Sequence, residues 1–257
     1  MTDDRKRALW AQAASEAATA ADGCAAVALP WRYRQKVEDF LKPQSRILDM
    51  APGDGAFLLA LRHPFAQTSV AESRPAALHR CEKKLAPLGI AVRQSAGDGT
   101  LPYDDDSFDL VLDRGALYAA GEVRRVLKPG GYFITEQAGG SDSLRLRRML
   151  GGGAERLDFN LENEIPRFLR AGFSINYKDQ CYAAARFSDT AALVRYAAAR
   201  PQLFPGFSVD GCFAQLLALD ALCARQGYIP DTRHRLILLR MYSRPSLACS
   251  NAFSKIS

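Results

Sequence analysis

One segment constrains the fold of this chain more than any other: Arg46-Ile-Leu-Asp-Met-Ala-Pro-Gly-Asp-Gly-Ala-Phe-Leu-Leu-Ala-Leu61. A short apolar run ends in Asp49, a glycine turn follows, and a helical apolar stripe begins directly behind it. This order predicts strand, tight turn and helix, the arrangement with which α/β proteins hold nucleotide-like cofactors. Gly53 and Gly55 lack a Cβ, so the backbone there can take positive φ and approach a ligand closely. The alternative is a glycine turn that only connects a strand to a helix.

Further segments repeat the pattern of a short apolar strand followed by a polar turn. Thr68-Ser-Val-Ala-Glu72 ends in an acid about 20 residues after the turn, where a carboxylate can accept hydrogen bonds from a ribose diol. The other expected strands are Ile90–Ser95, which precedes Gly97-Asp98-Gly99, the apolar end of Leu101–Asp113, and the end of Val126–Thr135 after a Pro-Gly-Gly turn. The ordered set is far more specific than any one member.

With these motifs in order, Ser45–Gln137 resembles the class I S-adenosylmethionine-dependent methyltransferases, in the group of small soluble bacterial members. The matching residues are Leu48–Gly55, Glu72, Asp98 with Leu101-Pro102, Ser107–Val111 and Val126–Gly131. The resemblance implies an α/β, Rossmann-like class I methyltransferase fold. Such a fold has a seven-stranded, mostly parallel sheet with helices on both faces. The resemblance also implies S-adenosyl-L-methionine as cofactor, across the carboxyl ends of the first strands, and it leaves the methyl acceptor open.

The resemblance carries a set of cofactor-binding residues onto this chain. They are Asp49, Ala51, Gly53, Gly55, Glu72, Asp98 and Gly99. In the family pattern the first acid holds the methionine ammonium, and the turn glycines let the methionine part pass close to the backbone. Glu72 would bind the ribose hydroxyls, Asp98 would accept from the adenine amino group, and Gly99 would offer its backbone N–H. Ala51 stands where the family usually has its first glycine, and alanine is the smallest substitute.

The main alternative is a nicotinamide or flavin enzyme built on a similar sheet. Dinucleotide binding favours G-x-G-x-x-G, whose third glycine lets the helix pack tightly while a pyrophosphate lies at its N-terminus. Here Ala56-Phe57-Leu58 follows the second glycine, and no third glycine is in place. Asp54 in the turn would repel a pyrophosphate, whereas the sulfonium and ammonium of S-adenosylmethionine favour acids around it. The charge pattern therefore favours the methyl donor.

The reacting end of the site is expected where Asp113-Arg-Gly-Ala-Leu-Tyr118 leaves the fourth strand. Methyl transfer is an in-line displacement at a carbon that the cationic sulfur already activates, so alignment matters more than any universal catalytic residue. Asp113, Arg114 and Tyr118 are the candidate catalytic residues. Asp113 could act as general base or orienting group, and Arg114 could bind an acceptor carboxylate or phosphate. Alternatively, Asp113 and Arg114 only pair with each other.

The same segment makes two methylation chemistries less favoured. Exocyclic amine methylation uses an Asn/Asp-Pro-Pro-Tyr motif, and pyrimidine C5 methylation uses a Pro-Cys nucleophile. The sequence after Asp113 contains neither motif. A small-molecule substrate is therefore favoured.

Composition is that of one enzyme-sized soluble protein: 257 residues, 48% hydrophobic and 24% charged. No apolar run approaches the roughly 20 residues that span a bilayer, and the N-terminus has no secretory apolar region. The 6 cysteines lack C-x-x-C spacing and the 3 histidines have no partner at metal-ligand spacing. We therefore expect reduced thiols, a cytoplasmic location, no membrane association and no metal.

The net charge of +6 raises a nucleic-acid hypothesis. The positive clusters are Arg145-Leu-Arg-Arg148 and Arg233-His-Arg235, and both are short, with no RNA-binding motif beside them. The first is expected to form a solvated helix face, with a phosphate-contacting rim as the alternative, and His234 is expected in a basic turn. An RNA methyltransferase and a catalytically silent S-adenosylmethionine-binding module remain the alternatives to a small-molecule enzyme. The oligomeric state stays open.

The chain divides into five predicted zones. They are N-terminal helices (1–43), a methyltransferase core with the cofactor site (44–187), a helical cap insertion (188–232), the last core strand (233–243) and a tail (244–257). The expected N-terminal helices cover 4–21 and 30–41, the second with Pro30 near its first turn. The sixth and seventh strands are expected at 173–182 and 235–242.

The predicted insertion between the last two strands carries two helical patterns, at 191–199 and 209–226. It could cap the acceptor site. An aromatic, mostly apolar pocket would then come from Tyr196, Phe204, Phe207 and Tyr228. Alternatively the insertion packs on the sheet edge as structure, or makes a dimer contact.

Overall fold

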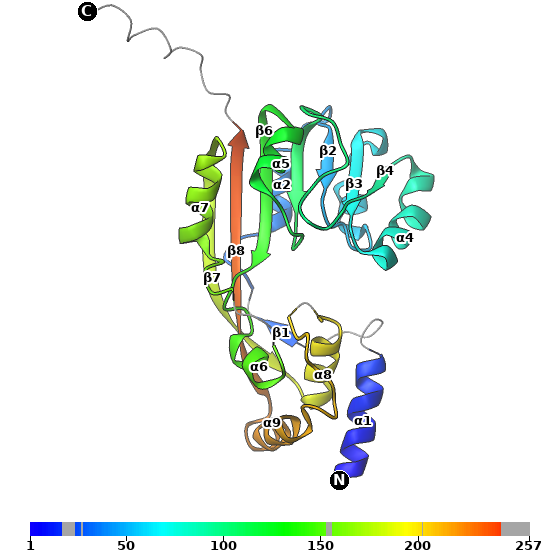
Figure 1. Cartoon of the computed structure of the whole chain (residues 1–257), viewed down its shortest axis with the longest axis vertical. Coiled ribbons are helices and arrows are strands. Elements are labelled where there is room, and N and C mark those ends of the chain that lie inside the picture. The colour runs from blue at the N-terminus through cyan, green and yellow to red at the C-terminus, as the bar shows by residue number, and fades with distance from the viewer. Residues whose placement is uncertain (17–23, 27, 153–155, 202, 243–257) are drawn as a thin grey trace, which may run out of the picture. The chain divides into compact units, whose positions relative to one another are not determined.

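The computed structural model describes residues 1–16, 24–26, 28–152, 156–201 and 203–242 (Figure 1). The chain forms two compact units. Unit 1 comprises Met1–Pro30, Ala138–Asn160 and Gln180–Arg235, and unit 2 comprises Trp31–Gln137, Leu161–Asp179 and Leu236–Ser257. Each unit is therefore built from segments that are far apart in sequence. The predicted tail and residues 17–21 of the first predicted helix lie outside the described residues.

Within the described residues, eight strands form one sheet in the order β1-β7-β8-β6-β5-β2-β3-β4. The strands are β1 (Cys24–Ala26), β2 (Ile47–Asp49), β3 (Thr68–Glu72), β4 (Ala91–Gln94), β5 (Phe108–Asp113), β6 (Leu127–Ala138), β7 (Phe173–Phe187) and β8 (Ile229–Tyr242). The seven predicted strands are present, which confirms the fold class. The additional strand is β1, which pairs antiparallel with the end of β7. Its 3 residues are too few for an alternation pattern to be read from the sequence.

The pairs β2–β3, β3–β4, β2–β5 and β5–β6 are all parallel. The chain moves outward from β2 through β3 to β4, then returns to the other side of β2 and continues from β5 to β6. Because βαβ crossovers are right-handed, the helices of these two halves cover opposite faces of the sheet. The reversal lies between β2 and β5, and ligands of open α/β sheets bind outside the carboxyl ends of the strands at such a point.

Helices alternate with these strands. They are α1 (Asp3–Ser15), α2 (Tyr33–Glu38), α3 (Ala56–Leu61), α4 (Pro75–Lys84), α5 (Ala120–Val126), α6 (Leu144–Met149), α7 (Leu161–Arg170), α8 (Thr190–Ala198) and α9 (Phe213–Gln226), with short 3₁₀ turns η1 (Phe65–Gln67) and η2 (Ala86–Leu88). The helical insertion before the last strand is thus present as α8 and α9. The helix expected over 30–41 is shorter in the structure, where α2 begins at Tyr33 and Pro30 precedes it.

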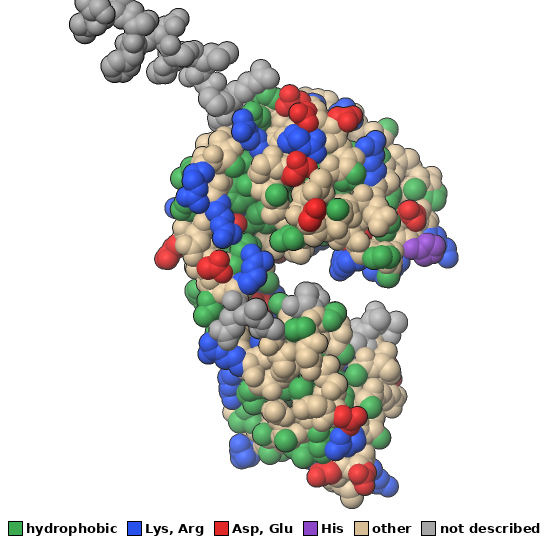
Figure 2. Space-filling view, in the orientation of Figure 1, with side chains coloured by type: hydrophobic (Ala, Val, Ile, Leu, Met, Phe, Trp, Pro, Cys, Tyr) green, Lys and Arg blue, Asp and Glu red, His purple; other side chains and the backbone are tan. Residues whose placement is uncertain are grey.

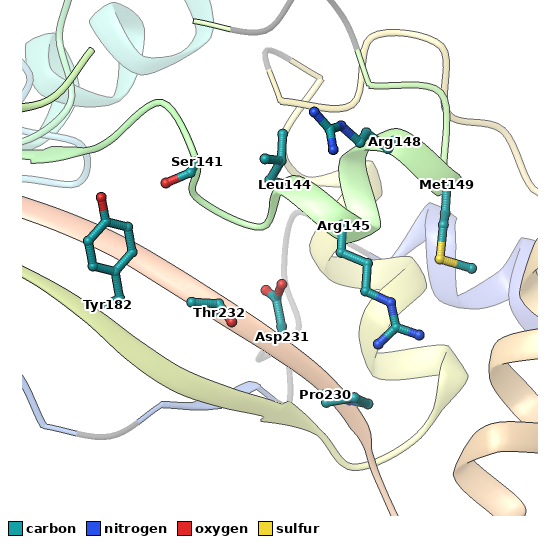
Figure 3. Close-up of a pocket in the computed structure, with 9 residues that line it drawn as sticks. All are labelled: Ser141, Leu144, Arg145, Arg148, Met149, Tyr182, Pro230, Asp231 and Thr232. Atoms are coloured by element: carbon teal, nitrogen blue, oxygen red, sulfur yellow. The ribbon is translucent and has the colours of Figure 1, made fainter. Parts of the chain in front are cut away.

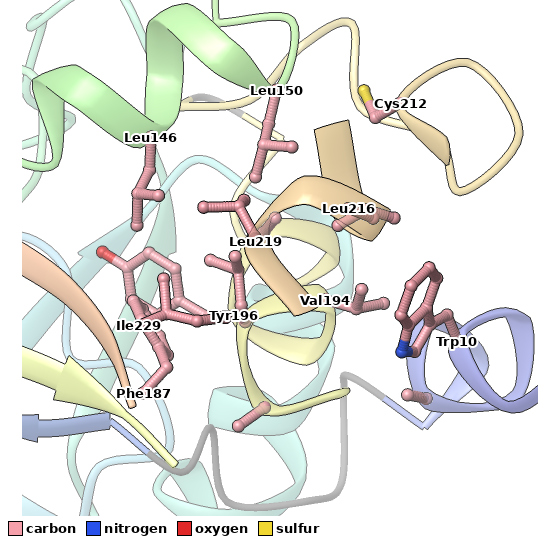
Figure 4. Close-up of a cluster of buried hydrophobic side chains, with 14 of the residues drawn as sticks. Trp10, Leu146, Leu150, Phe187, Val194, Tyr196, Cys212, Leu216, Leu219 and Ile229 are labelled. Atoms are coloured by element: carbon pink, nitrogen blue, oxygen red, sulfur yellow. The ribbon is translucent and has the colours of Figure 1, made fainter. Parts of the chain in front are cut away.

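Each unit has its own hydrophobic core. In unit 2 the sheet residues Leu48, Val111 and Phe133 are fully buried and belong to one cluster. In unit 1, Trp10 of α1 belongs to a cluster of buried side chains that also includes residues of α6, α8 and α9 (Figure 4). Tyr196 also lies in this second cluster. Burial of these apolar surfaces contributes about 25 cal/mol per Å² and is the main stabilising term.

The aromatic residues expected to line a pocket in the insertion have a different role. Tyr196 and Phe204 are both 2% exposed and belong to the core of unit 1. Phe207 packs against that core, and the ring of Tyr228 lies 4.5 Å below the guanidinium of Arg186. The predicted aromatic pocket is therefore wrong, because Tyr196 and Phe204 fill the interior of unit 1 and are not available to a ligand.

The last strand begins at Ile229, earlier than the predicted start at Arg235. The segment up to His234 contains a proline and charged residues, which favour a turn in a sequence reading. In the structure Asp231 and Arg233 are buried and form an ion pair of 3.2 Å. The predicted basic turn around His234 is wrong, because burial and pairing outweigh the weak strand propensity of this segment.

The predicted solvated arginine face of α6 is correct for two of its three residues. Arg145 and Arg148 are exposed. Arg147 is buried, and its Nη1 donates a hydrogen bond to the carbonyl oxygen of Gly140 at 3.0 Å.

Candidate active site

Three acids end three neighbouring parallel strands of unit 2. Asp49 is the last residue of β2, Glu72 of β3 and Asp113 of β5. The register pairs Asp49 with Val70 on one side and Leu112 on the other. Parallel strands present their carboxyl ends on one edge of a sheet, so the three acids share the edge at which the sheet reverses direction.

The glycine turn that follows β2 depends on two left-handed residues. Gly53 has φ +64° and Gly55 has φ +75°. A Cβ on Gly55 would lie 2.6 Å from Cδ2 of Leu85, so a side chain there would collide with the core. The carboxylate of Asp54 accepts a hydrogen bond from the backbone N–H of Ala56 at 3.0 Å and is exposed. The turn is thus an anchored start to α3, and both glycines are required by its backbone.

Asp49 is almost completely buried behind this turn. Its Oδ1 accepts a hydrogen bond from the backbone N–H of Ala51 at 3.2 Å. Burial raises the pKa of Asp49 to about 7, and the Ala51 N–H and the charge of Arg114 only partly oppose that effect. A cationic ligand group beside this carboxylate would favour its ionised form.

Glu72 is also buried, and Arg74 occupies its carboxylate. Glu72 Oε1 accepts from the backbone N–H of Arg74 at 3.0 Å, and the guanidinium donates to both oxygens at 3.1 and 3.0 Å. The side chain of Arg74 is 64% exposed, so it can move into solvent. The carboxylate is therefore positioned at the strand end but would have to exchange Arg74 for ribose hydroxyls.

A small cavity lies beside Glu72, between the loops that follow β3, β4 and β5. Its volume is about 30 Å³, roughly the volume of one water molecule in the liquid. It is lined by Met50, Ser73, Ser95, Gly97, Gly99, Thr100, Leu101, Ala116 and Leu117. Leu117 is 56% exposed, so its side chain can move away and enlarge the cavity.

The loop after β4 brings one of its two predicted residues to this cavity. Gly99 lines it with φ +97°, and a Cβ there would lie 2.8 Å from the backbone nitrogen of Ala119. Asp98 is fully exposed and accepts a hydrogen bond from the backbone N–H of Thr100 at 2.8 Å, which lowers its pKa. Asp98 therefore shapes the loop, and its carboxylate does not line the cavity in this arrangement.

Asp113 is fully buried, and protein groups already bond to both of its oxygens. Oδ1 accepts from the backbone N–H of Ala116 at 2.7 Å, while Oδ2 accepts from the Thr135 hydroxyl at 2.8 Å and from the Gln137 amide. Burial raises its pKa to about 6. These bonds tie the loop after β5 to β6, which is an orienting arrangement. A catalytic role for Asp113 stays a prediction.

Arg114 lies beside Asp113 but is exposed. No ion pair joins these two neighbours within the described residues, since Asp113 uses other donors. The guanidinium carbon of Arg114 lies 4.4 Å from the ring centre of Phe57 and 5.4 Å from that of Tyr33. A cation held over two aromatic rings at the end of β5 is available to an anionic group.

Tyr118 is mostly buried at the other end of the loop. Its hydroxyl donates to Glu164 Oε2 at 2.8 Å, and Arg167 pairs with the other Glu164 oxygen at 2.7 Å. Burial raises the pKa of Tyr118, and the buried guanidinium of Arg240 opposes that effect. Arg240 stacks on Phe168 with its guanidinium carbon 3.2 Å from the ring centre. Tyr118 thus joins a buried polar cluster.

The comparisons with known proteins match the part of the chain that contains these site residues. A family model described as the methyltransferase domain matches residues 48–135. These residues, about a third of the chain, match the methyltransferase domain and lie on the Rossmann-like fold of the methyltransferases. S-adenosylmethionine is the cofactor of this family. The match contains the glycine turn, the three strand-end acids and the loops around the small cavity.

A demethylmenaquinone methyltransferase from Thermus thermophilus is 36% identical over 116 residues, which are 41% of this chain and 53% of that protein. The chain spans about half the length of the curated relatives it matches. The solved structure of a candidate methyltransferase from Bacillus halodurans C-125 is similar with a TM-score of 0.59 and 13% identity, and covers 82% of this chain and 99% of that one.

The [4+2]-cyclase SpnF is also similar, with a TM-score of 0.52, 18% identity and coverage of 82% of this chain and 80% of that one. At such identities the structural likeness shows the fold alone. The fold therefore does not establish which reaction occurs at the carboxyl edge of the methyltransferase domain.

Several cavity residues of the methyltransferase domain were not predicted. They are Met50, Ser73, Ser95, Gly97, Thr100, Leu101, Ala116 and Leu117. Ser73 follows the end of β3 directly and Ser95 follows the end of β4. The rule that ligands bind beyond strand ends would have selected these two, whereas the apolar members carry no distinguishing signal.

Two further findings concern only the part of the chain that the structure describes. No group of three or more His, Cys, Asp or Glu side chains there is arranged to hold a metal ion. No described helix has both the length and the apolar character that a membrane crossing requires.

Proposed function

We propose that this protein is an S-adenosylmethionine-dependent methyltransferase with a small-molecule acceptor. The observation that carries the proposal is the carboxyl edge of the methyltransferase domain. There the buried Asp49, the left-handed glycine turn after it and the buried Glu72 lie at neighbouring strand ends, and Met50 and Ser73, which follow the two acids, line the small cavity together with Gly99. Glycines with positive φ, which leave the backbone uncovered by a side chain, next to buried acids suit a ligand that carries positive charge and passes close to the backbone.

The residues fit the cofactor in the following way. Asp49 would hold the methionine ammonium and Glu72 the ribose hydroxyls after Arg74 has moved into solvent. The cavity would take the adenine once Leu117 has moved away, since its present volume of about 30 Å³ is too small for a base. The bound cofactor would supply a methyl group on a cationic sulfur.

The chain's own residues would align the acceptor and exclude water. Asp113 holds the loop after β5 through bonds to Ala116, Thr135 and Gln137, so we propose it as a positioning residue. Arg114 is the exposed cation at this edge and would bind an anionic group of the acceptor. Where the acceptor must lose a proton, a group at this edge or solvent would remove it.

Two observations support a small-molecule acceptor over RNA. The relatives include proteins named demethylmenaquinone methyltransferase, a name that gives demethylmenaquinone and not RNA as the acceptor. Acidic and basic side chains are interspersed on the face of unit 2 drawn in Figure 2. RNA binding depends on a contiguous basic surface, which neutralises phosphates and makes affinity fall steeply with salt.

The test is turnover. Purified protein would be incubated with S-adenosylmethionine and a panel of small phenols, amines and carboxylates, and S-adenosylhomocysteine would be measured. Acceptor-dependent formation of S-adenosylhomocysteine, reduced in Arg114→Gln, is the expected result. Binding of S-adenosylhomocysteine without turnover on any acceptor, including cell extract, would favour a silent module or a different reaction on this fold, as the likeness to a cyclase illustrates.

A further inference from the structure

Unit 1 contains a cavity that shares no residue with the methyltransferase domain. Its volume is about 710 Å³, within the range of about 300–1,000 Å³ that small-molecule sites occupy. The wall comes from α6 with the loop before it, from Tyr182 on β7, and from Pro230, Asp231 and Thr232 on β8 (Figure 3). All these segments belong to unit 1.

The charges around this cavity leave one cation for a ligand. Asp231 is buried, and its Oδ2 pairs with Arg233 at 3.2 Å and accepts from the Ser143 hydroxyl at 2.7 Å, so Arg233 balances its negative charge, while its Oδ1 has no hydrogen-bond partner within the described residues. Arg145 forms no ion pair within the described residues and extends from α6 on the side of β8. Figure 3 shows Arg148 turning its guanidinium away from Arg145. The uncompensated charge at the cavity is therefore positive.

The rest of the wall is largely apolar and includes an exposed aromatic face. The Tyr182 side chain is 60% exposed. Its ring stacks on His234 at 4.4 Å between centres with an interplanar angle of 20°, which fixes its orientation. Leu144, Met149 and Pro230 supply aliphatic surface. A ligand with a ring or another flat apolar body can lie against this wall.

Ser141 adds a hydrogen-bond acceptor whose orientation the structure defines. The Ser141 backbone N–H donates to Nδ1 of His234 at 3.3 Å, so this nitrogen is an acceptor. In the tautomer with the proton on Nε2, the Ser141 hydroxyl 2.8 Å from the same nitrogen donates to it and shares its single lone pair with the backbone N–H. The lone pairs of the hydroxyl oxygen remain available to a ligand hydroxyl or amide N–H.

The wall is held rigidly, as a preformed site requires. The backbone N–H of Ser143 donates to the carbonyl of Thr232 at 2.9 Å, and that of His234 donates to Asp142 Oδ1 at 2.9 Å. A Cβ on Gly139 would overlap the His234 ring, so a glycine is needed to bring this backbone against the histidine.

We infer that this cavity binds a small organic anion with an aromatic or apolar body. Arg145 pairs with the anionic group, Tyr182 and the aliphatic wall contact the body, and Ser141 accepts from a polar hydrogen. No residue of the methyltransferase domain takes part, so the site is independent of the proposed methyl transfer.

The test uses 8-anilinonaphthalene-1-sulfonate, a fluorescent aromatic anion, and N-phenyl-1-naphthylamine, which has the same rings without the sulfonate. The full-length protein would be titrated with each probe, with and without saturating S-adenosylhomocysteine. Three variants are compared with wild type: Arg145→Gln, Tyr182→Ala and the control Arg225→Gln. Arg225 is an exposed arginine of unit 1 that does not line the cavity.

Saturable binding of the sulfonate is expected, unchanged by S-adenosylhomocysteine. Arg145→Gln should weaken it by about fivefold or more, because a charge-assisted pair is lost, and should leave the neutral probe almost unaffected. Tyr182→Ala should weaken both probes, and Arg225→Gln neither. Binding that does not saturate, or equal losses in Arg145→Gln and Arg225→Gln, would overturn the inference whatever S-adenosylhomocysteine does. Competition between the two ligands would place the probe in the methyl-donor site and also overturn it.

Discussion

At the scale of single residues, Asp49 is buried, yet it must be ionised to attract the ammonium group of the cofactor. Burial raises its pKa to about 7. A ligand ammonium is attracted only to the ionised form, so binding should strengthen as pH rises through this value and weaken below it. S-adenosylhomocysteine affinity should therefore fall by up to about tenfold per pH unit below pH 7. Calorimetric titrations between about pH 5.5 and 8.5 would measure this dependence.

A matched variant separates Asp49 from other titrating groups. The charge of Arg114 lowers the pKa of Asp49, so Arg114→Gln should move the midpoint of the pH dependence to higher pH. Asp49→Asn should bind weakly at every pH, with a flat profile. An affinity that does not change with pH in the wild type would show that Asp49 does not meet a cation.

The two turn glycines offer a second residue-scale test. Both have positive φ, but a Cβ on Gly53 meets nothing within 4 Å, whereas a Cβ on Gly55 collides with Leu85. Gly53→Ala should cost about 1 kcal/mol of unfolding free energy from backbone strain alone. Gly55→Ala should cost a further 1–3 kcal/mol or so from overpacking. Urea denaturation measures both, and equal losses would contradict the steric account.

At the scale of elements, the loop between β5 and α5 is held at both ends. Asp113 bonds to its start, and Tyr118 donates to the buried Glu164 near its end. Tyr118→Phe should lower the unfolding free energy by about 1–2 kcal/mol, because a buried acceptor loses its donor.

The same variant distinguishes structure from catalysis at Tyr118. Because Ala116 and Leu117 of this loop line the small cavity, Tyr118→Phe should also weaken S-adenosylhomocysteine binding several-fold. A large loss of turnover with unchanged stability and cofactor affinity would instead mark Tyr118 as a catalytic residue.

Elements with strong local signals were predictable from sequence. Strand β3 runs over Thr68–Glu72 as expected, and β5 ends at Asp113 as expected, because continuous apolar runs bounded by turns define buried parallel strands. The first part of β8 could not be predicted. Pro230 and the charged residues after it are stabilised as a strand only by tertiary burial and ion pairing.

Part of the candidate site could also be predicted from the sequence. The turn glycines and strand-end acids follow from motif order, and the structure brings Asp49, Glu72 and Gly99 to one edge. Two features of the site could not be predicted: Arg74 covers Glu72, and protein donors surround Asp113. Both features depend on side-chain contacts. Such contacts join residues of different elements, so no local pattern encodes them.

At the scale of the whole molecule, each unit has one of the chain's 2 tryptophans. Trp10 lies in the core of unit 1, and Trp31 in unit 2 donates to Glu136 at 2.6 Å. Trp10→Ala should cost about 3–5 kcal/mol and leaves Trp31 as the only tryptophan.

The strands β7 and β8 contribute residues to both units, so unfolding should be cooperative. Trp31 fluorescence in Trp10→Ala should then lose its native signal at the same lower urea concentration as the circular dichroism. A Trp31 transition unchanged from wild type would show that unit 2 unfolds on its own.

The central claim is that the methyltransferase domain binds its cofactor at the carboxyl edge of β2 and β3. Calorimetric titration with S-adenosylhomocysteine of wild type, Glu72→Ala and Arg74→Ala tests it most directly, since both variants break the same ion pair but only one removes the ribose acceptor. Micromolar binding that Glu72→Ala loses and Arg74→Ala keeps or strengthens is the predicted result. Equal binding by all three proteins, or none by the wild type, would contradict the claim.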